Sequence, residues 1–263
     1  MDDTMKTPFD EVIDNIVTEH YHNHRQQMHS DIVSRGIFRD LMQKCPELKQ
    51  DIDKQIVKSW LNVESPTQRG RKMDLLIGEP DAFGNPDLQK VRVCIENKSV
   101  ITAHRNRDAR FDDLYEVLQD LHGIKSEIIM GATVMVGIAE RVLNIPDGVK
   151  SHFKKRAREF QDTVVPRLST GDQKLWDDFP EDISENRVTD PVLTMQKFQA
   201  LPTRKIGHTH VKGYDYILFI PIFIDNVNPP YLARENNLDI DIDTEYQKML
   251  ERICSAYRTR WHL

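Results

Sequence analysis

Three residues in the first half of the chain, Asp74, Glu96 and Lys98, are of types that could together carry out hydrolysis at a phosphate. Glu96 and Lys98 end the strand-like segment VRVCIENK, and residues two apart on a strand face the same side. If Asp74 pairs with Glu96 across a hairpin, the midpoint of their numbers is 85, which coincides with the turn signal Gly84-Asn85. We therefore expect two carboxylates and one ammonium group to converge at one sheet edge.

Two carboxylates placed this close repel each other unless a cation lies between them. Their hard oxygen atoms suit Mg²⁺, with Mn²⁺ as a substitute. A bound metal ion can activate water and neutralise a phosphate under in-line attack, while Lys98 orients that water or stabilises the transition state. The simpler alternative is a solvated cross-strand ion pair without a chemical role.

The tripeptide acid-x-Lys has little value alone, and its context decides how it is interpreted. It occurs in this chain at Glu47, Glu96 and Asp172. The first copy lies in a helical pattern and the third in a loop-like segment. Only the copy at Glu96 ends a predicted strand.

The elements that must position these residues follow from the apolar spacing. Residues 9–17 and 32–41 have helical periodicity, with Gly36 as a candidate break, and Pro46 is expected to start a third helix that continues to Trp60. After a polar linker at 64–70, two short apolar segments separated by turn-forming residues predict a hairpin with a long connection. These two segments are residues 73–77 and 91–95.

The second half of the chain continues this alternation. Residues 111–121 have helical spacing, and residues 128–139 form a continuous branched run that is typical of a strand buried on both faces. The remaining expectations are a basic helix at 149–160, a loop-rich stretch at 163–190, a buried strand at 214–225 and a closing helix at 245–257. The order predicts a mixed α/β protein.

The motif and the order helix, hairpin, helix, strand resemble the PD-(D/E)XK nuclease superfamily over roughly residues 54–139. Asp74 matches the lone aspartate, Glu96 the second acid, Asn97 the variable position and Lys98 the lysine, while Met73 replaces a variable proline. The resemblance implies a restriction-endonuclease-like core, in which helices flank a central mixed β-sheet, with a helical N-terminal region. It also implies a metal site completed by the carbonyl of Asn97.

Size and a self-contained chain make this sequence most similar to the type II restriction endonucleases within that superfamily. The implied activity is Mg²⁺-dependent cleavage of double-stranded DNA by a homodimer, so that two sites cut two strands. We expect one nuclease domain with a helical region at 1–63, a catalytic core at 64–140 and a C-terminal elaboration at 141–263. Alternatives are a nucleic-acid-binding or assembly module without turnover, and a repair or phage-defence nuclease that selects structure.

Basic residues flank the proposed catalytic residues and are candidates for contacts with DNA phosphates or guanine edges. The alternative for the arginines is a solvated helix start, and for the histidine an ordinary surface position. These candidates are Arg71, Lys72, His104, Arg105, Arg107 and Arg110.

The histidines near the amino terminus invite a second metal interpretation, because His20 and His24 share a helix face. Neither an HExxH motif nor a nearby cysteine supports it, and a polar helix surface or partner interface is the alternative. Glu19 is a candidate accessory acid. His208 and His210 are candidates either for a DNA groove or for a plain turn.

Composition restricts the remaining options. The chain has 263 residues, 39% of them hydrophobic, and a formal charge of −6, so any polyanion must meet local basic surface. The longest apolar run is far shorter than the ~20 residues of a membrane span, and the acidic amino terminus lacks a secretory pattern, so we expect no membrane association and a cytoplasmic protein. The three cysteines predict neither a disulfide framework nor a zinc knuckle. Nucleotide-binding glycine motifs and a GxSxG elbow are absent.

Overall fold

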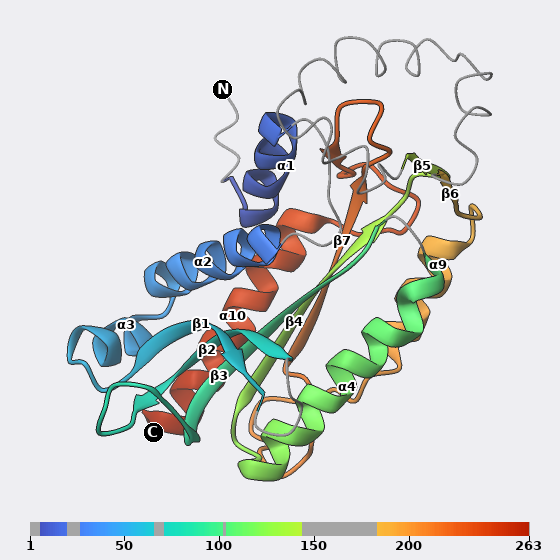
Figure 1. Cartoon of the computed structure of the whole chain (residues 1–263). Coiled ribbons are helices and arrows are strands. Elements are labelled where there is room, and N and C mark those ends of the chain that lie inside the picture. The colour runs from blue at the N-terminus through green and yellow to red at the C-terminus, as the bar shows by residue number, and fades with distance from the viewer. Residues whose placement is uncertain (1–5, 20–26, 66–70, 102–103, 144–182, 263) are drawn as a thin grey trace.

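A computed structural model describes residues 6–19, 27–65, 71–101, 104–143 and 183–262, and its centre is a six-stranded sheet of order β1-β2-β3-β4-β7-β8 (Figure 1). Strands β1, β2 and β3 are antiparallel neighbours, β4 is parallel to β3 and β7, and β8 is antiparallel to β7. The sheet is therefore mixed. Its strands are β1 (Lys58–Glu64), β2 (Lys72–Pro80), β3 (Pro86–Val100), β4 (Ile129–Gly137), β7 (Tyr216–Phe223) and β8 (Tyr231–Leu232).

Helices cover both faces of this sheet, and each face has its own apolar core (Figure 1). One layer holds α1 (Pro8–Glu19), α2 (Gln27–Lys44), α3 (Pro46–Asp53) and α10 (Ile242–Trp261). The opposite layer holds α4 (Arg107–Ile124) and α9 (Asp190–Gln199). Smaller elements are η1 (His104–Asn106), β5 (Arg141–Leu143) and β6 (Ile183–Glu185). The mixed α/β class is confirmed, and no described helix is both long and apolar enough to cross a membrane.

The two buried strands expected from the sequence are the parallel pair β4 and β7. Every residue of β4 is buried, because β3 and β7 flank it and helices cover both faces. Branched side chains such as Val134 and Ile220 therefore pack on opposite faces of one continuous sheet. The segment after residue 141 thus supplies an internal strand of the fold.

Close to Asp74 and Glu96, β2 and β3 pair in the register that the turn signal Gly84-Asn85 predicts. Leu75 pairs with Ile95 and Ile77 with Val93, so that the numbers in each pair are centred on 85. Nearer the turn, the pairing register shifts at Gly78, and the two strands remain paired as far as Pro80 and Pro86. The connection is therefore shorter than expected. Its turn is held by backbone N–H groups of Phe83 and Asn85 that donate to the Asp81 carboxylate.

The expected third helix is wrong beyond Asp53. Gln55 has a φ of 58°, which turns the chain out of the helix, and Trp60 lies on β1 instead. Ile56, Val57 and Trp60 do have helical spacing, but backbone pairing of β1 with β2 outweighs this weak local preference. Because β1 pairs with β2, the hairpin is internal to the sheet, and the predicted location of the site at a sheet edge is also wrong.

Gly36 does not interrupt α2, contrary to its role as a candidate break. A Cβ atom at this position would lie 2.5 Å from the ring of Pro8, so glycine permits the close approach of α1 and α2. The expected basic helix at 149–160 and most of the loop-rich stretch at 163–190 lie outside the described residues. Helix α9, which begins at Asp190, was not anticipated.

Candidate active site

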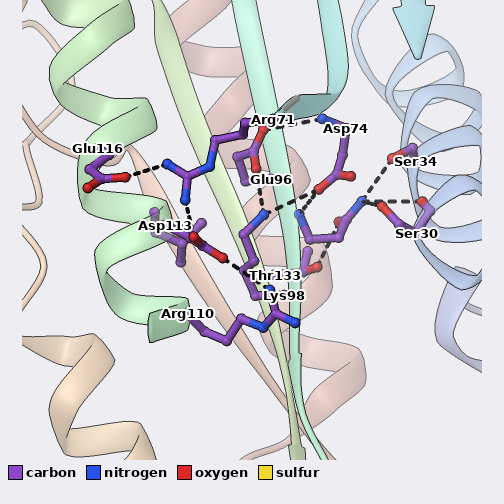
Figure 2. A network of polar contacts seen from close by, with 12 residues as sticks. Ser30, Ser34, Arg71, Asp74, Glu96, Lys98, Arg110, Asp113, Glu116 and Thr133 are labelled. Carbon is purple, nitrogen blue, oxygen red and sulfur yellow. Dashed lines mark hydrogen bonds and ion pairs between the residues drawn. The ribbon is translucent and has the colours of Figure 1, made fainter. Parts of the chain in front are cut away.

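Asp74, Glu96 and Lys98 meet on β2 and β3, as their spacing predicts. The Lys98 ammonium lies 2.7 Å from Oε2 of Glu96 and 3.8 Å from Oδ2 of Asp74. Figure 2 shows Glu96 and Lys98 on the side of β3 that faces α4, whereas Asp74 is drawn between β3 and α2, with the Lys98 ammonium reaching toward it. One positive charge is therefore shared by two carboxylates from neighbouring strands.

Backbone groups hold the two acids in this arrangement. The N–H of Asn97 donates to Oδ2 of Asp74 at 2.7 Å, and the N–H of Asp74 donates to Oε1 of Glu96 at 3.2 Å. From the helical layer that contains α2, the Gln27 amide donates to Oδ1 of Asp74 at 3.4 Å. Asp74 is therefore held by β3 and by the helical layer that contains α2.

The Asn97 side chain points away from Lys98, toward α2 (Figure 2). Its amide nitrogen donates to the hydroxyl groups of Ser30 at 3.2 Å and Ser34 at 2.8 Å, while its carbonyl accepts from the Thr133 hydroxyl at 2.8 Å. These contacts anchor β3 to α2 and β4. Because the side-chain nitrogen and oxygen of Asn97 are both hydrogen-bonded, the oxygen of Asn97 to consider as a metal ligand is that of its main-chain carbonyl.

Burial controls the electrostatics of the site. Glu96 is 0% exposed and Asp74 is 6% exposed. Burial raises the pKa of Glu96 to about 7, although the Lys98 charge opposes this shift. Burial lowers the pKa of Lys98, but the charges of Glu96 and Asp74 outweigh it, and the net shift is upward. Lys98 is therefore held as the charged partner of a carboxylate that takes up a proton easily.

The donor set fits a hard divalent cation. Asp74 and Glu96 supply carboxylate oxygens, the ligand type that Mg²⁺ binds, and the Lys98 contacts mark a position where a positive charge is within reach of both. Each carboxylate also accepts a backbone N–H, which limits its motion. A metal ion there would compete with the Lys98 ammonium for Glu96.

Arg71, predicted as a DNA contact, instead ties the start of β2 to α4 (Figure 2). Its guanidinium pairs with Asp113 and lies 2.6 Å from Glu116, and its side chain is 18% exposed. Asp113 also accepts from Arg110 at 3.1 Å. Arg71 and Arg110 therefore share an acidic partner next to Lys98.

The other basic candidates lie at the surface around the start of α4 and β2. Lys72 and Arg105 are exposed, and Arg107 is partly exposed with its guanidinium 3.7 Å from Asp190. Arg110 is 44% exposed. These four side chains remain accessible to a ligand that approaches this part of the surface.

His104 is not accessible, which corrects its assignment as a DNA contact. It is 2% exposed, and its ring nitrogens lie 2.7 Å from the Thr194 hydroxyl and 2.8 Å from the Gly137 carbonyl. Burial lowers its pKa, so the neutral imidazole is favoured. Its contacts join η1 to α9 and the end of β4, which is a packing role.

The structure adds α2 to the site, which sequence reasoning missed. Gln27 donates to Asn62 at 2.8 Å as well as to Asp74, and Asn62 has a φ of 56° within β1. No local motif identifies Gln27, because its relation to Asp74 depends on helix packing. The expected accessory side chain of Glu19 lies outside the described residues, as do His20, His22 and His24. His208 and His210 are exposed in the turn region before β7.

Comparisons of this chain with protein-family models, with curated proteins and with solved structures found no match. The arrangement of the site must therefore carry the functional argument.

Proposed function

We propose that this chain is a Mg²⁺-dependent endonuclease that hydrolyses phosphodiester bonds in double-stranded DNA, with Mn²⁺ able to replace Mg²⁺. The observation that carries the proposal is the convergence of Asp74 and Glu96 on the Lys98 ammonium, at 3.8 and 2.7 Å. Two acids held by backbone hydrogen bonds can bind a metal ion, and a lysine beside them can orient water, so these groups suit metal-assisted hydrolysis.

The order of elements supports the same proposal at the level of fold. Helices precede the hairpin of β2 and β3, and α4 and the parallel strand β4 follow it. This is the order expected of a restriction-endonuclease-like core. The finer proposal is a type II restriction enzyme that acts as a homodimer, since two sites are needed to cut both strands.

In this proposal, Asp74, Glu96 and the main-chain carbonyl of Asn97 hold the metal ion. Bound Mg²⁺ supplies an acidified water and positive charge for the phosphate. Lys98 releases Glu96 and orients the attacking water by hydrogen bonding, while the Asn97 N–H keeps Asp74 aimed at the site. Lys72, Arg105, Arg107 and Arg110 are the side chains we assign to DNA phosphates.

A specific observation favours a second candidate, a nucleic-acid-binding or assembly module without turnover. Glu96 is 0% exposed and already paired with Lys98, so the cluster is neutralised in part without a metal ion. Such a buried ion pair can serve packing alone. A third candidate, within enzymes, is a repair or phage-defence nuclease that selects DNA structure.

Cleavage of plasmid DNA tests the proposal. The parent should cut in Mg²⁺ or Mn²⁺ and not in EDTA, and Lys98→Ala should reduce the rate by about 10²-fold or more. Lys90→Ala is the matched control, because Lys90 is an exposed lysine of the same strand β3. Circular dichroism checks that each variant folds. Equal cleavage by Lys98→Ala and the parent would refute the assignment.

The same assay separates the alternatives. DNA binding that persists in EDTA, without cutting in either metal across varied substrates, identifies the module. Digestion of a long DNA of known sequence to discrete bands identifies a sequence-specific enzyme, whereas a smear identifies a nuclease without a fixed site.

A further inference from the structure

A second cluster of potential metal ligands lies in the helical layer formed by α2, α3 and α10. Cys45 joins α2 to α3, Glu47 is in the first turn of α3, and Cys254 is in α10. The two thiol sulfurs and a Glu47 carboxylate oxygen all lie within 4.8 Å of one another. Both cysteines are free thiols.

We propose that Cys45, Cys254 and Glu47 form a Zn²⁺ site that is independent of the acidic cluster on β2 and β3. Tetrahedral zinc binds thiolates at about 2.3 Å and carboxylate oxygens at about 2.0–2.2 Å, so its ligand atoms are separated by roughly 3.5–3.8 Å. The observed grouping requires only small side-chain movements to reach these separations.

The contacts that Cys45, Cys254 and Glu47 now make leave their sulfur and oxygen atoms free to bind a metal ion. The Cys45 sulfur lies 3.9 Å from Oε2 of Glu47, and the Cys254 sulfur lies 3.7 Å from the Lys44 carbonyl, which are long contacts for a thiol. Oε1 of Glu47 accepts from Arg258 at 2.6 Å. Glu47 therefore uses one oxygen for an arginine and directs the other toward the thiols.

This arrangement supplies an oriented carboxylate ligand, because outer partners of this kind fix the direction of a metal ligand. It also balances charge. Zn²⁺ with two thiolates and one carboxylate carries one net negative charge, which the Arg258 guanidinium offsets. Binding releases the two thiol protons to solvent and involves no oxidation.

The exposure of the three residues shows how a metal ion could reach the site and where its fourth ligand would bind. Cys45 is 0% exposed and Cys254 is 6% exposed, whereas the Glu47 side chain is 21% exposed. A metal ion can therefore enter beside Glu47, and a water molecule on that side completes the tetrahedron. The thiol chemistry selects zinc over Mg²⁺, since soft sulfur ligands do not suit magnesium.

Cobalt titration of the full-length reduced chain tests this site. After removal of metals with EDTA, Co²⁺ should produce a thiolate-to-cobalt charge-transfer band that saturates at one ion per chain, and Zn²⁺ should abolish it. Cys254→Ala should remove the band. Glu47→Gln, which changes a partly exposed side chain, should weaken Co²⁺ binding at least about tenfold and decides the question if Cys254→Ala does not fold.

Two control variants isolate the cluster. Cys94→Ala removes the cysteine outside it, and Asp74→Asn alters the acidic cluster, so both should retain the band and a Zn²⁺-dependent rise in Tm. No band in the reduced parent, or an unchanged band in Glu47→Gln and Cys254→Ala, would overturn the proposal. A Cys45–Cys254 disulfide in protein isolated without reductant, together with no cobalt band after reduction, would identify a redox pair instead.

Discussion

The backbone N–H of Asn97 donates a 2.7 Å hydrogen bond to Oδ2 of Asp74, which joins β3 to the acid on β2. The side chain of the same asparagine points toward α2, where it donates to Ser34, and accepts a hydrogen bond from Thr133 of the neighbouring strand β4. The residue between Glu96 and Lys98 therefore sets the position of Asp74 while it anchors β3 to the helices behind the sheet.

Thr133→Val should show the importance of this anchor. The change keeps the shape of the side chain but removes the hydroxyl that donates to Asn97, leaving a buried carbonyl unsatisfied. We expect the free energy of unfolding to fall by about 1–3 kcal/mol, measured by urea denaturation. Thr18→Val is the control, because the exposed Thr18 hydroxyl bonds only its own helix, and its effect should stay within about 0.5 kcal/mol. Equal effects of the two variants would contradict the anchor.

Glu96 should make the stability of the metal-free protein depend on pH. Its pKa is about 7 in the folded chain, compared with 4.5 for an ordinary glutamate, so between these values the folded state keeps a proton that the unfolded state loses. This contribution to stability is fully present below pH 4.5 and is lost as the pH rises through 7.

Glu96→Gln removes that dependence. Over this window the parent should lose stability relative to the variant, by at most about 1.4 kcal/mol per pH unit. Urea denaturation in EDTA at a series of pH values measures the difference, and Glu64→Gln controls for the loss of one exposed charge. Parallel curves for the parent and Glu96→Gln would contradict the assignment of this proton.

Arg105 and His104 are adjacent in sequence but should respond differently to substitution. Arg105→Ala removes an exposed charge, and we expect weaker DNA binding and a salt dependence of log K that is smaller by about 0.9 for each DNA phosphate that Arg105 neutralises. His104→Ala should instead lower the free energy of unfolding by about 1–3 kcal/mol, because it leaves the buried Thr194 hydroxyl and Gly137 carbonyl without this partner. Fluorescence anisotropy at several salt concentrations, with urea denaturation, checks both results. An unchanged salt slope for Arg105→Ala would remove Arg105 from the interface.

Gly36 and Gly123 offer a matched pair in helices α2 and α4. Gly36→Ala places a Cβ 2.5 Å from the Pro8 ring and should cost about 1–3 kcal/mol by forcing α1 and α2 apart. Gly123→Ala meets no atom within 4 Å and should stabilise by about 0.5–1 kcal/mol through the higher helix propensity of alanine. Thermal unfolding of both variants is the measurement. Similar shifts in Tm would show that α1 moves aside freely.

The convergence of the two acids and the lysine was predictable, unlike the position of the site within the sheet, because the convergence depends on short-range rules. Strand alternation places Glu96 and Lys98 on one side, and the turn near Gly84 sets the register that brings Asp74 beside them. The burial of β4 and the formation of helix α10 were predictable in the same way, from local composition and apolar spacing. The nuclease activity itself stays a prediction.

Only the tertiary structure decided which residues far apart in sequence meet. Gln27 reaches Asp74, Arg71 turns to Asp113 and Cys45 meets Cys254 because helices pack on two sides of the sheet. Trp60 joins β1 despite its helical spacing because a neighbouring strand pairs with its backbone. Local sequence specifies backbone preference and the side a residue faces, whereas burial and long-range partners depend on the summed packing of the whole chain.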